Sequence, residues 1–164
     1  MHWQFTPYVF PVAASAIISA ALAVTAWYRR HAPGAIAFCL LMLAVAEYSF
    51  GYVFELAHSD LPTVLFWDNL EWIGATLAPL LWLIFVLQYT GRGRWLTPRI
   101  IALLTIVPLV TILLVWTNQY HHLVQYNLHI DRSGSFAALS LTRGVWYWVD
   151  VAYSYVLLLI GALC

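Results

Sequence analysis

Five long runs of apolar residues divide the sequence. They lie at about residues 8–28, 35–57, 66–90, 98–117 and 145–163. Each run is long enough to cross a hydrocarbon core roughly 30 Å thick, because a helix rises about 1.5 Å per residue. The pattern predicts an all-α fold, a polytopic membrane helix bundle, in which residues 1–164 form one transmembrane domain.

The composition agrees with a membrane protein. The chain of 164 residues is 63% hydrophobic and 9% charged, and it contains no lysine, whereas ordinary soluble chains are about a quarter charged. The formal net charge is zero, so the composition predicts no nucleic-acid partner. The lipid bilayer is the partner that it indicates.

The arginines are concentrated in the first and third connections between the predicted helices. The second connection has none, and the fourth has two, Arg132 and Arg143, across its greater length. Arg29 and Arg30 fall in the first connection, and Arg92, Arg94 and Arg99 surround the third. Because positively charged loops stay on the cytoplasmic side, these two connections are expected inside the cell. The amino terminus and the fourth connection are then expected outside.

The fourth connection, residues 118–144, is the only long one. Apolar and polar residues alternate over Val124–Ile130, and the turn-forming run Asp131–Ser135 is followed by a second short apolar run. This pattern predicts a small extracytoplasmic β-hairpin over residues 123–142 that covers the outer face as a lid. A disordered loop is the alternative, because a lone two-stranded hairpin is marginal unless it packs on something.

Five acidic residues fall inside the predicted helices, and four of them share the outer half. Helix 35–57 places Glu55 near the outer boundary and Glu47 eight residues deeper, a distance of about 12 Å. Asp68 and Glu71 lie in the first turns of the third helix, and Asp150 lies near the start of the fifth. Isolated carboxylates are costly in hydrocarbon, so these residues are expected to line a cavity, bind a ligand or pair with other groups.

The spacing of the acids puts them on shared helix faces. Glu47 and Glu55 lie on one face of their helix, and Asp68 and Glu71 share a face with Trp72. No lysine or arginine falls in the outer halves of these helices, so we expect the acids to have no basic partner within reach. Two alternatives to a ligand cavity stay open: a structural polar network between helices and, for Asp68 alone, a favourable interaction with the helix dipole.

The candidate ligand-binding residues combine these acids with polar and aromatic neighbours. Four aromatic residues fall further inside the helices than the interface belts, where they are expected to line a cavity; they are Trp72, Trp82, Tyr147 and Tyr153. Asn118 and His121 follow the fourth helix on the outer side. The full candidate set is Glu47, Glu55, Asp68, Glu71, Trp72, Asn118, His121 and Asp150.

The sequence contains no catalytic motif and names no cofactor. It has no phosphate-binding glycine loop, nucleophile elbow or metalloprotease helix. Cys39 and Cys164 match no metal or disulfide framework, and a buried apolar role is favoured for both. Solvation at the interface is favoured over metal binding for the outer histidines, which lack a strong metal-site spacing; they are His58, His121, His122 and His129.

Three stretches carry a resemblance to a known family. They are AEYSFGYVFEL in the second helix, FWDNLEWIGATLAPLLWLIFVLQYTGR in the third and WTNQYHHL after the fourth. Their most specific parts are the pair Pro79 and Trp82, the segment Tyr89–Arg92 and the segment Asn118–Leu123. From about residue 20 onward the chain resembles the amino-terminal seven-transmembrane region of bacterial sensor histidine kinases, a family in which some members carry a diguanylate cyclase module instead of a kinase.

The resemblance implies a signal-input module in the bacterial cytoplasmic membrane, multi-pass and with its amino terminus outside. It implies an unidentified small-molecule ligand in the outer half and a cytoplasmic output domain, in a two-component histidine kinase that is a homodimer in its full-length form. The family has seven helices, so the chain is expected to stop two helices short. No kinase activity is expected of this chain alone.

Two other functions stay open from the sequence. A transporter or proton-relay protein also uses intramembrane carboxylates. It should also show polar groups in the inner halves of the helices, and those halves are almost entirely apolar. A passive structural membrane subunit is favoured if every outer acid is paired within the bundle.

Overall fold

Five long helices build the protein in the computed structural model, which describes residues 8–131 and 138–164. Each of the five is long and apolar enough to cross a membrane. The predicted all-α membrane bundle with five spans is therefore confirmed for the described residues. The helices are α1 Val9–Tyr28, α2 Ala35–Ala57, α3 Leu61–Tyr89, α4 Pro98–Trp116 and α6 Val145–Ala162.

Helix α3 begins five residues earlier than the predicted start at residue 66. Pro62 lies in its first turn, where a missing N–H leaves no hydrogen bond unmade and the fixed φ suits the helical backbone. The segment that was predicted as a connection therefore includes the start of the helix. Asp68 is the eighth residue of α3, beyond the first turn to which the dipole effect is confined.

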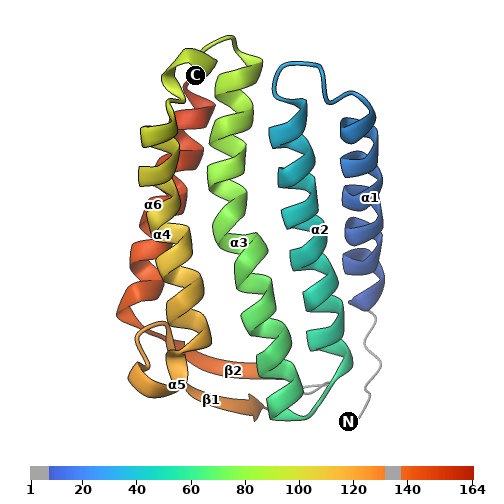
Figure 1. Ribbon diagram of the computed structural model, residues 1–164. Coiled ribbons are helices and arrows are strands. Elements are labelled where there is room, and N and C mark those ends of the chain that lie inside the picture. Colours follow the sequence, from blue (N-terminus) through green and yellow to red (C-terminus); the bar gives the residue numbers. More distant parts are fainter. Residues whose placement is uncertain (1–7, 132–137) are drawn as a thin grey trace.

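Helix α3 lies at the centre of the bundle (Figure 1). Helix α2 packs along one side of it, with α1 beyond α2, while α4 and α6 pack on the other side. Leu80, Leu83 and Leu87 of α3 form a buried cluster with Leu157 of α6. Outward faces stay apolar, as at Ile17 on α1, which is 71% exposed. Apolar residues on every face are typical of helices surrounded by lipid.

The bundle has two chemically different ends. At one end, the α1–α2 and α3–α4 connections carry Arg29, Arg30, Arg92 and Arg94, and the 3₁₀ turn η1, Gly93–Trp95, leads toward α4. We call this the arginine end. At the opposite end α2 ends, α3 begins and the two strands lie across the bundle (Figure 1). We call it the hairpin end.

The two predicted strands are present at the hairpin end. The short helix α5, Asn118–His121, is followed by strand β1, Gln125–Asp131. Strand β2, Ala138–Arg143, pairs antiparallel with β1. The predicted turn at residues 131–135 falls almost entirely outside the described residues. The strand pairing of the hairpin prediction is therefore confirmed.

A β-bulge interrupts the alternation in β1. Tyr126 pairs with Thr142 and His129 pairs with Ser140, so three steps along β1 match two along β2. Such an extra residue changes the direction of the side chains on either side of it. The polar Gln125 is 1% exposed, whereas Tyr126 is 40% exposed. Gln125 lies ahead of the bulge and faces the helices.

Candidate ligand-binding cavity

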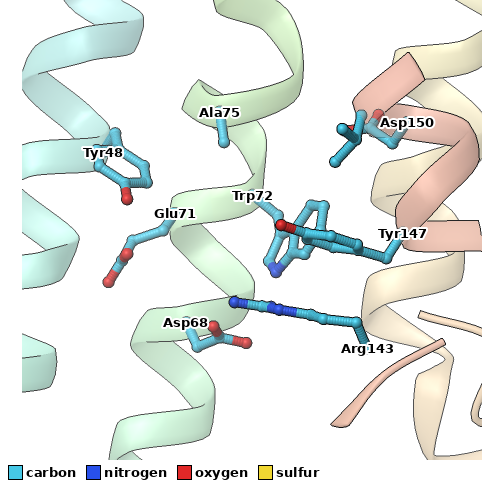
Figure 2. A pocket seen from close by; sticks show the side chains of 9 residues that line it. Tyr48, Asp68, Glu71, Trp72, Ala75, Arg143, Tyr147 and Asp150 are labelled. Atoms are coloured by element: carbon cyan, nitrogen blue, oxygen red, sulfur yellow. The ribbon is translucent and has the colours of Figure 1, made fainter. Parts of the chain in front are cut away.

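A cavity of about 260 Å³ lies between α2, α3 and α6 near the hairpin end. Four predicted site residues line it, namely Asp68, Glu71 and Trp72 of α3 and Asp150 of α6. Figure 2 shows the α3 side chains between Tyr48 of α2 and the residues of α6. The complete lining is Tyr48, Asp68, Glu71, Trp72, Ala75, Arg143, Tyr147, Asp150 and Val151.

Asp150 joins three helices through one carboxyl oxygen. Its Oδ1 accepts hydrogen bonds from the hydroxyl groups of Thr76 on α3, at 2.8 Å, and of Thr111 on α4, at 2.9 Å. Trp146 Nε1 donates to the Thr111 hydroxyl oxygen at 2.9 Å. Asp150 and both threonines are buried. This acid is therefore part of a polar network between helices as well as part of the cavity lining.

Asp68 connects the cavity to the hairpin. Gln125 Nε2, at the start of β1, donates a hydrogen bond to Asp68 Oδ2 at 2.6 Å. Arg143, the last residue of β2, lines the same cavity, and its positive charge acts on Asp68. Its guanidinium carbon lies 4.6 Å from the centre of the Tyr147 ring. Figure 2 shows the Arg143 side chain reaching past Tyr147 toward Asp68.

Arg143 overturns the expectation that the outer acids have no basic residue within reach. It lies 75 residues after Asp68 in the chain and outside every predicted helix. The antiparallel return of β2 brings it back to the cavity. One feature of the sequence could have indicated Arg143: it lies just before the predicted fifth helix, whose first turns also carry Asp150.

Glu71 is buried between α3 and α2. It is 6% exposed, and its carboxyl group lies within hydrogen-bond reach of the Glu55 carboxyl group on α2. Among the described residues, its Oε1 has no hydrogen-bond partner. Gly51 makes room for the side chain, because a Cβ atom there would lie 2.6 Å from Glu71 Cγ. Glu55 borders the cavity beside Glu71 without lining it.

Glu47 lies between α2 and α3, outside the cavity lining. Its Oε2 accepts a hydrogen bond from the backbone N–H of Gly74 at 2.9 Å. Its Oε1 has no partner within the described ranges. The absence of a side chain at Gly74 allows this contact, since a Cβ atom there would lie 2.3 Å from the carbonyl oxygen of Ala44. Glu47 therefore joins two closely packed helices.

Asn118 and His121 lie beside the hairpin and do not line the cavity. Asn118 Nδ2 donates to the carbonyl oxygen of Gln125 at 2.6 Å, and its Oδ1 accepts from the N–H of Val124 at 3.1 Å. His121 Nδ1 accepts from the N–H of Leu123 at 3.1 Å. Both residues hold the chain that enters β1, so they position Gln125 next to Asp68.

The lining combines charged side chains with aromatic rings. The rings of Trp72 and Tyr147 meet edge to face, with centres 6.1 Å apart and planes at 83°. Residues 8–131 and 138–164 contain no group of three or more His, Cys, Asp or Glu side chains arranged to hold a metal ion. Tyr48 and Arg143, which sequence reasoning did not select, complete a site of acids, aromatic rings and one guanidinium.

The fold and this cavity define a multi-pass membrane protein with a polar site inside a helix bundle. A family model described as the N-terminal 7TM region of histidine kinase matches residues 11–164. The chain belongs to this family, which confirms the resemblance found in the sequence and places the chain in transmembrane signalling by sensor kinases. No curated protein and no solved structure matches the chain significantly.

Proposed function

We propose that the chain is the signal-input domain of a bacterial two-component histidine kinase, in which a ligand in the cavity controls a cytoplasmic output domain. The supporting observation is the lining of the cavity, which draws side chains from α2, α3, α6 and the end of β2. A ligand that contacts four elements stabilises the arrangement in which they lie close together. It thereby shifts the balance between two arrangements of the bundle, as a sensor requires.

The packing of α3 against α6 offers a route from the cavity to the arginine end. Beside the cavity, Thr76 of α3 donates to Asp150 of α6. Further along, the leucine cluster of α3 packs against Leu157. Closely packed interfaces transmit displacement because they have few voids to absorb it. The arginine end is expected in the cytoplasm, where an output domain would receive the change.

The placement of polar groups favours sensing over transport. Among the described helices, Glu47 and Asp150 are the acids nearest the arginine end, where they bond to Gly74 and Thr76 of α3. Beyond them α3 and α6 meet through leucines. A transporter needs a path on both sides of its site, whereas this cavity lies toward one end. A passive structural subunit is also disfavoured, because Oε1 of Glu71 lacks a partner among the described residues.

Replacing Glu71 by its amide in the full-length protein tests this proposal. Glu71→Gln keeps the shape of the side chain but removes its charge and part of its acceptor capacity. We expect the fold to persist and the response of the output domain to weaken. Phosphorylation of the output domain is measured in cells of the native host grown in rich medium. Thermal unfolding of the purified protein is measured in parallel.

Asp131→Asn is the matched control. Asp131 is exposed on β1 and lies outside the cavity lining, so the same change from acid to amide at this position should leave the output unchanged. If Glu71 only holds helices together, Glu71→Gln lowers stability by about 1 kcal/mol, as for other intramembrane polar contacts. Normal output per folded molecule in that variant would refute a sensing role for the cavity.

A further inference from the structure

The cavity lining holds more acidic than basic groups. Asp68, Glu71 and Asp150 share it with a single guanidinium, that of Arg143, which lies over the Tyr147 ring and acts on Asp68. The described hydrogen bonds of Asp150 come from threonine hydroxyl groups. Glu71 lies against another acid. A ligand with positive charge would therefore balance the lining.

Oε1 of Glu71 is a buried acceptor next to the cavity. The side chain is 6% exposed, and no donor within the described residues reaches this oxygen. A buried acceptor without a donor costs free energy, which a bound N–H group recovers. Glu55 adds a second carboxyl group within reach. Charged donors bind such oxygens more strongly than neutral ones do.

Aromatic side chains form the wall beside these acids. Trp72 and Tyr147 meet edge to face, and Tyr48 lies on the α2 side (Figure 2). The faces of such rings attract organic cations and pack against alkyl groups. A metal ion needs several oxygen, nitrogen or sulfur ligands instead, and the described residues contain no such group of three. The wall therefore fits an organic cation better than an inorganic one.

We infer that the cavity binds a small organic ammonium ion that has at least one N–H group and no carboxylate. This inference rests on the proposed function and names its ligand class. The ammonium group donates to the Glu71 carboxyl group, and the alkyl part packs against the aromatic rings of the lining. The volume of about 260 Å³ lies near the lower end of the range for ligand pockets, about 300–1,000 Å³, which limits the ligand to a small molecule.

Four small probes separate the features of such a ligand. n-Butylammonium carries a positive charge and N–H groups. 1-Butanol has a neutral donor of similar size, and tetramethylammonium has the charge without an N–H group. 4-Aminobutyrate keeps the ammonium group and adds a carboxylate. Each is titrated by calorimetry into the full-length protein in lipid nanodiscs at about pH 7, where an alkylamine is protonated like a lysine side chain. Empty nanodiscs correct for partition into lipid.

Butylammonium is expected to bind saturably, and at least about tenfold more tightly than each of the other probes. 1-Butanol and tetramethylammonium lose the charged hydrogen bond, and 4-aminobutyrate adds a negative charge to a lining that is already rich in acids. The inference is overturned if butylammonium shows no saturable binding. It is equally overturned if 1-butanol, tetramethylammonium or 4-aminobutyrate binds as tightly. This comparison uses the unaltered protein, so it decides the question even if a variant fails to fold.

Glu71→Gln tests the assigned contact. It should weaken butylammonium binding by at least about tenfold, whereas Asp131→Asn should bind it like the wild type; unchanged binding in Glu71→Gln contradicts the assignment. If butylammonium does not bind but Glu71→Gln alters phosphorylation, the ligand class is wrong and the sensor proposal stands. If it binds without altering phosphorylation, the ligand class stands and the sensor proposal fails.

Discussion

The buried carboxyl groups near the cavity differ in what donates to them. Asp150 accepts from two threonine hydroxyl groups, Glu47 from a backbone N–H and Asp68 from a side-chain amide of the hairpin. Glu71 lies against Glu55 and keeps a buried oxygen without a described donor. In the sequence all of these residues are simply acids. Only their hydrogen-bond donors distinguish those with a structural role from the one proposed to bind a ligand.

The contact at Gly74 should be sensitive to a single methyl group. In Gly74→Ala, the added Cβ would lie 2.3 Å from the Ala44 carbonyl oxygen and 2.5 Å from Glu47 Oε2, so α2 and α3 must move apart. We expect the free energy of unfolding to fall by about 1–3 kcal/mol, measured by denaturant unfolding in mixed micelles.

Gly93→Ala is the control for this substitution. Its added Cβ would approach its nearest neighbour, in Gln88, only to 3.8 Å, so its effect should stay within about 0.5 kcal/mol. Equal losses of stability in the two variants would mean that the close approach of α2 and α3 at Gly74 does not limit the fold.

The hairpin owes its order to contacts with the helices at both strands. A lone pair of strands is marginally stable. Strand β1 is joined to α3 through Gln125 and Asp68, and β2 ends at Arg143 in the cavity lining. Gly144 follows β2 in a position where a Cβ atom would lie 2.1 Å from the Leu123 carbonyl oxygen. The same contacts place the hairpin as a lid at one edge of the cavity.

Asn118→Ala should loosen this lid. The substitution removes the Asn118 hydrogen bonds to the backbone of Val124 and Gln125, each worth about 1 kcal/mol. Amide hydrogen exchange in β1 should therefore become at least about tenfold faster. Gln119→Ala removes an exposed amide one residue later and should leave exchange unchanged. Rapid exchange throughout β1 in the wild type would instead support the disordered loop.

For the whole molecule, the arginine end should face the cytoplasm. The positive-inside rule places the α1–α2 and α3–α4 connections there. In a variant without Cys39 and Cys164, Ala32→Cys and Gly93→Cys should resist an impermeant thiol reagent applied to intact cells, whereas Gln119→Cys at the opposite end should react. Labelling at the first two sites and protection at the third would reverse the orientation.

The helices could be predicted from sequence because each residue of a span meets lipid or the bundle interior directly. Helix α2 accordingly begins and ends at the predicted residues 35 and 57. The start of α3 was missed because Pro62 is typical both of connections and of first helical turns. The cavity was predicted in part: Asp68 and Asp150 follow from depth, whereas Arg143 depends on strand pairing that returns it from a distant part of the chain.

The length of α3 also indicates from which side of the membrane the proposed ligand would enter. Its 29 residues rise about 43 Å, while the hydrocarbon core is about 30 Å thick. With Tyr89 at one boundary of the core, Asp68 lies 21 residues away, or about 32 Å, which is the level of the opposite headgroups. The Asp68 end of the cavity lining is therefore expected at the level of water on the hairpin side. The organic cation that we propose would reach it there without crossing the membrane.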